Sequence, residues 1–527
     1  MSKFNKIKKT TKVINHVGSK AFKESDEFEL ASLVLTSFVE NMYYEDTYSQ
    51  MSRMENLINK IDSKFAAKLA IYARDQFHMR SMSHVVAAIM AKYNLTSGKS
   101  WSTDFYNNVI QRPDDMSEII SLYWKDGKKK LPNALKRGFK KAFDKFDDYQ
   151  IAKYKMKNRD ISLVDIINMV RPKPTKNNIN SISGIINNKS VIANTWESKL
   201  TQAGQNFNNE KDKSIAKGES WTELIISGKI GYFALLKNLR NILTYAPNTV
   251  DKVCDLLTDE KLLTNSKVLP FRFISAYNAI NKYMNTESDN LLNFDEDKNK
   301  NDNVIKIKKA LNKALEISVQ NLPYIPGNTI ILSDNSASMG SCTDNSLVSA
   351  MSSIDTSDIA NLFATLFWTR CENTAIGLFG DRCINPILNM NRDLSIFENF
   401  DIITQESKKC GGSTEQGIFD MLNELINKNN TDVDRIIIFS DCQIGSNCSW
   451  YDTLGNRGDG FNMLYGKYKK INPKVKVYSI TLKGYGDTVF NSDVYKLAGW
   501  SNKIFDLISV LEQDKNAFIN DIKKVEL

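Results

Sequence analysis

The sequence has few of the side chains on which catalysis and zinc binding most often depend. Its 527 residues include three histidines and seven cysteines, and the cysteines form no Cys-x-x-Cys pair. An odd number of cysteines argues against a disulfide framework, and their spacing argues against a structural zinc site. Three histidines leave few candidates for Ser-His or Cys-His catalysis, and no nucleophile–base pair is visible. We therefore expect free thiols and a binding protein that is not an enzyme.

Long apolar runs are absent as well. A membrane-spanning helix needs about 20 mostly apolar residues, whereas IIIF at Ile436–Phe439 is typical of the strand-length runs found here. The N-terminal sequence MSKFNKIKKTTK is basic, but no apolar stretch follows it, and this is not the pattern of a secretory signal. We expect a cytoplasmic protein that has no membrane partner.

The excess of positive charge is concentrated in one window. The chain has 70 Lys and Arg against 61 Asp and Glu, a net charge of +9, and residues 124–173 contain 15 of the former against 6 of the latter. This window therefore holds the whole excess. Its apolar residues repeat at helical spacing, which places many of its lysines on the other faces of a helix. Cations neutralise phosphates and aromatic rings stack on unpaired bases, so the charge favours a nucleic-acid partner. A solvated helix face is the alternative.

The first part of the chain, from about residue 20 to 320, has a helical pattern. Amphipathic segments of helix length follow one another with short links, for example at residues 28–41, 64–75, 83–93, 231–243 and 304–319. Such a succession predicts an array of helical repeats. The polar, charge-rich segment 287–303 is expected to be a loop.

The second part, from residue 326, alternates strand-length apolar runs with helices. The expected strands are residues 329–332, 374–379, 435–440 and 475–481. Helices are expected at residues 359–370 and 416–428. This alternation predicts a doubly wound, parallel α/β sheet, in which ligands bind at the carboxyl ends of the strands.

Polar residues follow two of these expected strands. Asp334, Ser336 and Ser338 form an Asp-x-Ser-x-Ser pattern after the first, and Asp441 follows the strand at 435–440. Thr414 lies in a Gly-rich loop that opens a helix. Carboxylate and hydroxyl oxygens suit a hard cation such as Mg²⁺, although ordinary turns use the same residue types.

Together these five residues resemble the metal-ion-dependent adhesion site of von Willebrand factor A domains. The resemblance implies that Asp334, Ser336, Ser338, Thr414 and Asp441 hold a divalent cation, directly or through water. Mg²⁺ is expected, with Mn²⁺ or Ca²⁺ as alternatives. In that family a partner's carboxylate often takes an open coordination position, so the site serves docking without turnover.

The helical part resembles the TROVE module of the Ro sixty-kilodalton autoantigen family, in particular its bacterial or phage-type members. The matching stretches are residues 72–91, 153–175, 194–204, 219–242 and 267–277. With the adhesion-type site, the resemblance covers roughly residues 25–515. It implies a TROVE-like module over residues 20–320 and a von Willebrand factor A-like domain over residues 326–527.

That family implies a ring of HEAT-like helical repeats together with an α/β domain. Members bind small non-coding Y-type RNA on an outer basic surface and single-stranded 3′ ends of misfolded RNA in a central hole. They act in RNA quality control, and bacterial relatives work with exoribonucleases. The expected partners are therefore RNA and an exoribonuclease or another protein, with no DNA partner.

Candidate RNA contacts come from the charge window and from the family match within it. They are Lys136, Arg137, Lys140, Lys141, Lys153, Lys155, Lys157, Arg159, Arg171 and Lys173. Arg171 stands where the family has a histidine, which leaves the identity of the RNA open. Candidates to line the hole are Arg74, Arg80, Arg112, Lys237 and Arg240.

Two other functions are compatible with these motifs. The protein is a docking scaffold if the metal site recruits an acidic partner and the helices bind protein. It is a nuclease if the metal site cleaves RNA, but hydroxyl-rich ligation lacks the carboxylate cluster of a two-metal phosphodiesterase.

Overall fold

Contacts divide the chain into two compact units, each described here by itself. The computed structural model describes residues 12–37, 41–154, 160–187, 196–205, 209–287, 294–320, 322–340, 354–380, 383–384, 390–410, 417–445, 460–491, 493–511 and 514–527. The α/β unit combines residues 1–83 with 322–526, and the helical unit comprises residues 84–321 with the C-terminal Leu527. The boundary at residue 322 lies where the sequence pattern changes, whereas the boundary at residue 83 has no counterpart in that pattern.

The α/β unit is built around a six-stranded sheet. Its strand order is β5-β4-β3-β6-β7-β9, and all neighbours are parallel except β4 and β5. The strands are β3 (Ile325–Asp334), β4 (Cys371–Phe379), β5 (Cys383–Ile384), β6 (Arg435–Ser440), β7 (Lys476–Thr481) and β9 (Tyr495–Ala498). The chain runs outward from β3 to β4 and β5, then returns to place β6 on the other side of β3. This reversal creates a topological switch point between β3 and β6.

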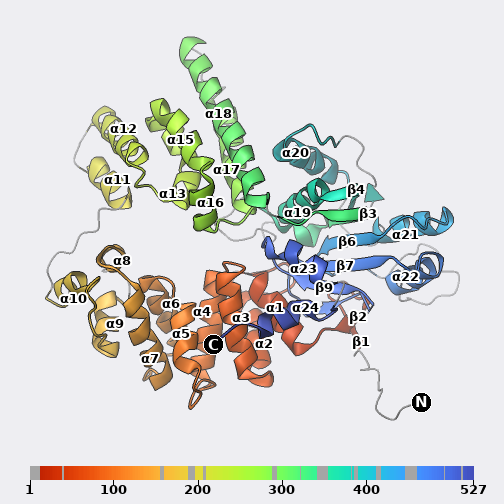
Figure 1. The fold of residues 1–527 in the computed structure, drawn as a ribbon, viewed down its shortest axis with the longest axis horizontal. Helices are drawn as coiled ribbons and strands as arrows, with labels where there is room; N and C mark the ends of the chain where they lie inside the picture. Colours follow the sequence, from red (N-terminus) through yellow and green to blue (C-terminus); the bar gives the residue numbers. More distant parts are fainter. Residues whose placement is uncertain are drawn as a thin grey trace. The chain divides into compact units, whose positions relative to one another are not determined.

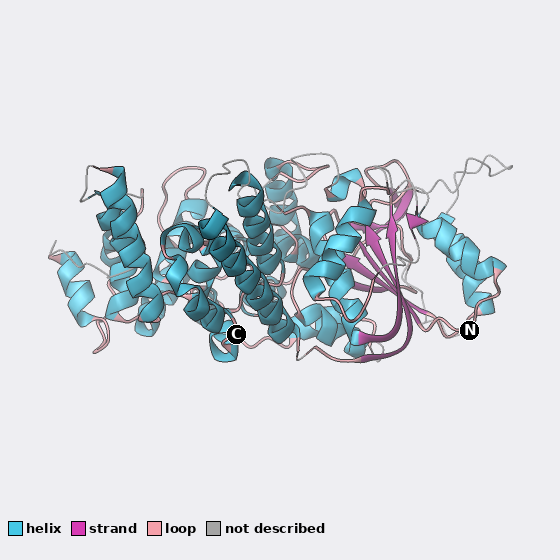
Figure 2. Cartoon of the chain, turned by 90° about the horizontal axis from the view of Figure 1, so that it is seen from above, coloured by secondary structure: helices cyan, strands magenta, loops and turns pink. Residues whose placement is uncertain are grey.

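Helices cover both faces of this sheet (Figure 2). The helices of the second part of the chain are α19 (Thr356–Arg370), α20 (Ile396–Ser407), α21 (Gly417–Asn427), α22 (Gly460–Ile471), α23 (Lys503–Leu511) and α24 (Ala517–Lys523). Alternation along β6 separates two cores: Ile436 and Ile438 pack in a cluster with residues of α21 and α22, whereas Phe439 packs on α19. A strand buried on both faces reads as a continuous apolar run, which is why IIIF predicts it.

Residues near the N-terminus belong to the α/β unit, although the sequence pattern groups them with the helical part. They form β1 (Lys12–Ile14), β2 (Lys20–Lys23), α1 (Asp26–Leu35), α2 (Thr47–Lys60), α3 (Ser63–Asp75) and the start of α4 (Arg80–Lys92). The strands join β8 (Asp487–Thr488) in a small antiparallel sheet, with Phe22 opposite Thr488. Tyr72 on α3 also donates a hydrogen bond of 2.9 Å to Asp521 on α24. These pairings are long-range, so periodicity along the chain does not reveal them.

The helical unit contains only helices as regular structure among its described residues (Figure 1). After α4 they are α5 (Ser102–Val109), α6 (Pro113–Tyr123), α7 (Asn133–Ala142), α8 (Asp148–Lys153), α9 (Leu163–Val170), α10 (Ile179–Ile186), α11 (Trp196–Gln205), α12 (Glu210–Ile226), α13 (Tyr232–Lys237), α14 (Leu239–Tyr245), α15 (Val250–Leu257), α16 (Glu260–Ser266), α17 (Phe271–Glu287) and α18 (Phe294–Val319), with short 3₁₀ turns at η1 (Phe143–Lys145) and η2 (Pro247–Thr249). Pairs such as α5 with α7, α11 with α12 and α15 with α18 are in contact.

Two expectations about these helices are wrong in detail. The expected loop at 287–303 is helical from Phe294 onward, where α18 extends N-terminally from the buried residues Val304 and Ile307. The expected helix 231–243 is two helices, because the backbone leaves helical geometry at Asn238, whose side chain donates a 2.8 Å hydrogen bond to the Ala234 carbonyl.

The combination of a helical unit with a doubly wound α/β unit confirms the predicted fold class. Closure of the helices into a ring stays a prediction. Within the described residues, none of the helices combines the length and the apolar character that crossing a membrane requires.

Candidate functional site

The expected metal ligands lie at the switch point of the sheet. Asp334 is the last residue of β3, Ser336 and Ser338 follow in the next turn, and Asp441 comes directly after β6. Because β3 and β6 are parallel neighbours, their carboxyl ends bring the two aspartates to the same edge. All four residues are buried. The fifth candidate, Thr414, lies outside the described residues.

Hydrogen bonds hold the loop after β3 in place. The Ser336 amide donates to Asp334 Oδ1 at 3.0 Å, and the Ser440 hydroxyl donates to Asp334 Oδ2 at 2.6 Å. The hydroxyl oxygens of Ser336 and Ser338 are 3.2 Å apart. Asn335, which lies between Asp334 and Ser336 in the sequence, exchanges hydrogen bonds of 2.8 and 3.1 Å with Asn361 on α19. Hydrogen bonds within this loop and from Ser440, at the end of the neighbouring strand β6, therefore hold the oxygens of the Asp-x-Ser-x-Ser pattern close together.

The arrangement fits a divalent cation. Asp441 accepts a 2.9 Å hydrogen bond from the Gln443 amide through Oδ1, but its Oδ2 is buried without a hydrogen-bond partner among the described residues. Leaving a buried carboxylate oxygen unpaired is costly. Asp334, Ser336, Ser338 and Asp441 would hold the ion, which would supply positive charge to two buried carboxylates and a Lewis-acid centre for an anionic partner.

The pKa values of the two buried aspartates also favour a bound cation. Burial, with the charge of Asp441 in second place, raises the pKa of Asp334 to about 7. Burial likewise raises the pKa of Asp441, against the opposing effect of the Gln443 amide. Two like charges in a desolvated site disfavour the doubly ionised state, and a bound cation would reverse this preference.

A buried lysine that the sequence analysis did not single out lies at the same site. Lys483 is 4% exposed and its ammonium donates a 2.6 Å hydrogen bond to the Ser338 carbonyl. Burial lowers its pKa to about 8, and the charges of Asp441, Asp355 and Asp334 act in the opposite direction. In the sequence, its position just after β7, the strand next to β6, is the feature that could have indicated it. No group of three or more His, Cys, Asp or Glu side chains suited to a metal lies together in the described part of the chain.

The expected basic helix forms as predicted. In α7 and the following turn, Leu135, Phe139, Phe143 and Phe146 are buried. Arg137, Lys140 and Lys141 are exposed, and Lys136 is half-buried. The helix therefore presents several cations to solvent on the faces that do not pack.

Part of this charge is paired with α5. Lys141 forms an ion pair with Asp104, and the neighbouring Lys145 donates to the backbone carbonyls of Asn107 and Ile110. Arg137 donates a long 3.4 Å hydrogen bond to Thr103. Lys136 and Lys140 are therefore the cations of α7 best placed for a phosphate.

A tyrosine connects two of the predicted sets. The ring of Tyr154 lies 4.6 Å from the Arg112 guanidinium and 5.5 Å from the Lys153 ammonium. Arg112 also forms a two-point ion pair with Asp114, at 3.0 and 2.8 Å. One expected hole residue and one expected outer-surface residue therefore share an aromatic ring. Lys155, Lys157 and Arg159 lie outside the described residues.

Arg171 and Lys173 are exposed after the end of α9. Arg171 ends that helix in the left-handed conformation, with φ of 48°, and its amide donates to the Ile167 carbonyl at 2.8 Å. A side chain with a Cβ atom pays a strain cost in this conformation, and Arg is not a residue that usually adopts it.

The remaining hole candidates are divided between the units. Arg74 and Arg80 belong to the α/β unit, and Arg74 is only 8% exposed. Lys237 and Arg240 are exposed in the helical unit. Lys237 lies 5.9 Å from the ring of the exposed Phe233, and Arg272 lies 5.8 Å from the same ring. Their convergence on one hole stays a prediction.

Two groups of cations are not among the candidate residues predicted from the sequence. Arg272 lies in the matched stretch KVLPFRFISAY, and Lys128–Lys130 form the KKK of the charge window. The Trp124 indole donates a 2.7 Å hydrogen bond to the Lys129 carbonyl, and the Tyr123 hydroxyl donates to the Lys130 carbonyl at 3.0 Å. The loop therefore presents its lysines on a fixed backbone.

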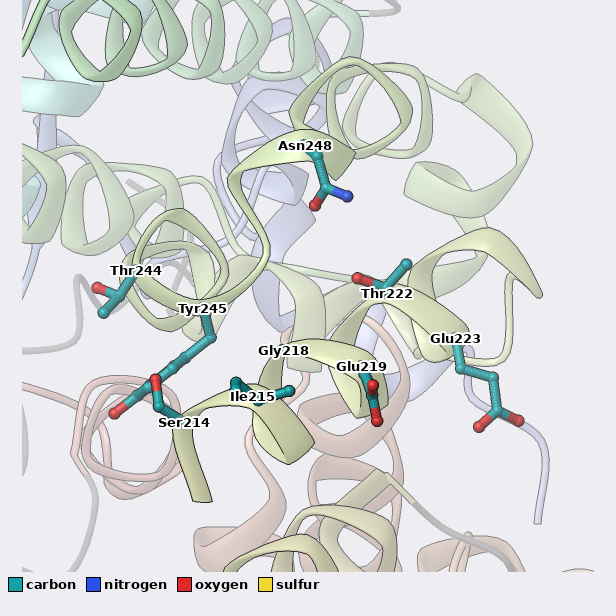
Figure 3. A pocket seen from close by; sticks show the side chains of 9 residues that line it. All are labelled: Ser214, Ile215, Gly218, Glu219, Thr222, Glu223, Thr244, Tyr245 and Asn248. Atoms are coloured by element: carbon teal, nitrogen blue, oxygen red, sulfur yellow. The ribbon is translucent and has the colours of Figure 1, made fainter. Parts of the chain in front are cut away.

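The helical unit also has a groove between α12 and α14 (Figure 3). Its volume is about 630 Å³, and hydroxyl, amide and carboxylate groups line it together with Ile215, Gly218 and the ring of Tyr245. Two of the lining groups are acidic, Glu219 and Glu223, and Glu223 pairs with Lys199 on α11. This lining differs from that of the cationic surfaces described above.

Comparison with known proteins gives matches in sequence and in structure. A protein-family model described as the TROVE domain matches residues 28–213 and 188–319. Telomerase protein component 1 of Mus musculus is 22% identical over 343 residues, and that of Rattus norvegicus is 20% identical over 340 residues. Each alignment covers 49% of this chain, and the chain spans 13% of the length of these relatives.

The crystal structure of the Deinococcus radiodurans Ro (RSR) protein is similar to this one. The TM-score is 0.54, the sequence identity is 14%, and the match covers 90% of this chain and 97% of that protein. At this level of identity the likeness concerns the fold.

Proposed function

Because the chain belongs to the TROVE domain family, we propose that it is an RNA-binding protein of the Ro type. The observation that supports this most directly is the cationic face of α7, with exposed Arg137 and Lys140 and half-buried Lys136, inside the segment that the family model matches. Such cations bind the phosphate backbone, and their affinity for RNA depends on salt because counterions are released.

The finer part of the proposal concerns which RNA is bound and where. Small structured non-coding RNA of the Y type binds the basic surface formed by α7, Lys153 and the Arg171–Lys173 turn. Single-stranded 3′ ends of misfolded RNA bind in a central hole. In this role the protein acts in RNA quality control in the cytoplasm, as a scaffold without catalytic turnover, and an exoribonuclease is the expected protein partner.

A salt series of filter-binding measurements tests the proposal. The RNAs are one hairpin with a single-stranded 3′ tail, the same hairpin with a blunt end, and the tail alone. We expect affinity to fall steeply with salt and the tailed hairpin to bind most tightly. A flat salt response would exclude phosphate binding, and equal affinity for blunt and tailed hairpins would exclude recognition of the free end.

We also propose that the adhesion-type site holds a divalent cation, with Mg²⁺ as the first candidate, and docks an acidic protein. The specific observation that favours this is the buried Oδ2 of Asp441, which none of the described residues hydrogen-bonds. The test is a pull-down from the native host, treated with nuclease, with wild type and Asp334→Ala. A partner that resists nuclease but is lost on chelation and in the variant supports docking; a partner unaffected by either treatment contradicts it.

A further inference from the structure

The loop between α6 and α7 holds three consecutive lysines on a fixed backbone. Lys128, Lys129 and Lys130 are all exposed. The Trp124 indole donates a 2.7 Å hydrogen bond to the Lys129 carbonyl, and the Tyr123 hydroxyl donates at 3.0 Å to the Lys130 carbonyl. Tyr123 is the last residue of α6 and Trp124 follows it. Two aromatic donors at the end of a helix therefore fix the position of the lysine segment.

Three further contacts hold the rest of this loop. Asp126 forms a 2.9 Å ion pair with Lys92 on α4. The Gly127 amide donates at 2.9 Å to the Trp124 carbonyl, with φ of 113° at Gly127, a value that glycine adopts without strain. Leu131, directly after the lysines, is buried. The one acidic residue of the loop is therefore paired with another helix, and the loop backbone is held at both ends.

The charges of the three lysines are not neutralised by the protein. In the described part of the chain, no carboxylate forms an ion pair with any of them. Lys141, in the same charge window, is by contrast paired with Asp104. Like charges held side by side repel one another and destabilise the folded state. The arrangement is therefore unfavourable in the free protein, and a bound polyanion would relieve it.

The aromatic rings of the loop are in contact with the lysines themselves. The Lys128 ammonium lies 5.7 Å from the centre of the Trp124 ring, and the Lys129 ammonium lies 4.6 Å from that of Tyr123. Tyr123 is buried and Trp124 is half-buried. An unpaired base needs the exposed face of a ring to stack on. The loop therefore offers charge to phosphates and little aromatic surface to a base.

We propose that the α6–α7 loop is a preorganised phosphate-binding loop for the double-helical stem of an RNA, in which its three lysines contact phosphates and Trp124 and Tyr123 are positioning residues. The inference rests on the proposed RNA binding and adds a second cationic surface to that of α7. A duplex carries phosphates at higher density than a single strand, and each contact with it releases more counterion. A backbone that is already ordered loses less conformational entropy on binding.

Filter binding of the full chain tests the role of the lysines. The RNAs are a blunt hairpin and a single strand without secondary structure, and the variant combines Lys128→Gln, Lys129→Gln and Lys130→Gln. We expect it to bind the hairpin on the order of tenfold more weakly at about 0.1 M salt and to reduce the salt slope by about three, one for each lost contact. The loss for the single strand should be smaller. Urea unfolding should show a variant at least as stable as wild type, because the repulsion between the lysines is removed.

Ring-preserving variants test the positioning role. Trp124→Phe combined with Tyr123→Phe removes both hydrogen-bond donors and no charge. We expect hairpin affinity to fall by roughly threefold, about the effect of one net hydrogen bond, with the salt slope of wild type because all cations remain. Trp101→Phe is the control, since this tryptophan is also half-buried and its indole makes no hydrogen bond to any described residue. An unchanged affinity of the double variant, or a reduced salt slope, would overturn the positioning role.

The control for charge substitutes Gln for Lys252, Lys309 and Lys313, three exposed lysines of α15 and α18 in the same unit. Equal losses in the two triple variants, or no loss in the loop variant, would overturn the loop while RNA binding by wild type stands. A larger loss for the single strand than for the hairpin would overturn the assignment to the stem. A wild-type protein that binds neither RNA would overturn the proposed function and the loop with it.

Discussion

The two buried aspartates at the ends of β3 and β6 dominate the chemistry of the α/β unit at the scale of single residues. Asp334 and Asp441 are fully buried, and the ammonium of Lys483 is directed to the Ser338 carbonyl. Buried charges are tolerated when they are paired and hydrogen-bonded. Asp334 has both oxygens occupied, whereas Asp441 Oδ2 has no hydrogen-bond partner in the described part of the chain. This asymmetry makes Asp441 the ligand that depends most on an added cation.

The buried Glu29 on α1 makes the free energy of unfolding depend on pH. Burial raises its pKa above the ordinary value of 4.5, although Arg53 acts in the opposite direction. The folded protein therefore holds this proton more tightly than the unfolded chain. Its stabilising contribution is complete below pH 4.5 and is lost as the pH rises through the folded-state pKa. In wild type this group makes the free energy of unfolding fall as the pH rises. We expect a smaller fall in Glu29→Gln than in wild type, measured by urea unfolding from about pH 4.5 to 7.

The control for this experiment is Glu526→Gln, which neutralises an exposed carboxyl group of the same unit. It should leave the slope as in wild type. A slope that is the same in all three proteins would contradict the role of Glu29.

At the scale of elements, α7 combines packing and a cationic surface in ten residues. Its buried face includes Gly138, where the helix crosses α5. A Cβ atom at this position would lie 2.3 Å from Tyr106 Cβ and 3.1 Å from the Thr103 carbonyl oxygen. The close approach explains why a residue with poor helix propensity occurs in the middle of this helix.

We expect Gly138→Ala to lower the free energy of unfolding by about 1–3 kcal/mol, because the added methyl group overpacks the α5–α7 contact. Gly466→Ala on α22 is the matched control, since a Cβ atom there meets nothing within 4 Å. That change should raise stability by about 0.5–1 kcal/mol through helix propensity. Chemical unfolding of both variants measures the difference, and a Gly138→Ala protein as stable as wild type would disprove the close contact.

The exposed face of α7 supports a prediction about RNA. Lys136→Glu with Lys140→Glu should weaken binding of a structured RNA by on the order of tenfold at about 0.1 M salt and reduce the salt slope by about two, one for each lost phosphate contact. Lys408→Glu with Lys428→Glu makes the same charge change on exposed lysines of the α/β unit. Filter binding of both double variants separates local contact from net charge, and equal losses in the two would argue against a binding surface on α7.

At the scale of the whole molecule, the candidate metal ligands and the candidate outer-surface RNA contacts belong to different units. Ser336→Ala removes a hydroxyl of the metal loop that no RNA candidate touches among the described residues. We expect it to abolish cation binding, measured by titration calorimetry, and to change RNA affinity less than about twofold, since the effects of changes at sites that share no partner are independent. Chelation of wild type should likewise leave RNA bound. Release of RNA on chelation would show that the two sites are coupled.

Much of the fold follows from patterns along the chain. The run RIIIFS predicts β6 at its observed bounds, and the apolar spacing of Leu135, Phe139 and Phe143 predicts the buried face of α7 and its following turn. Both signals are local, because the apolar period of a strand or helix depends only on the residues of that element. The polar beginning of the long helix α18 is not predicted, because residues 294–303 have no apolar period to detect.

The sequence by itself determined the residue types of the candidate sites: carboxylates and hydroxyls after the strands, and an excess of lysine in one window. Only the tertiary structure decided their environment. It buried Lys483 beside the metal loop, paired Lys141 with Asp104, and joined Tyr72 to Asp521 by a hydrogen bond. These contacts join residues far apart in the chain, and their energies depend on burial and distance, which a one-dimensional pattern does not specify.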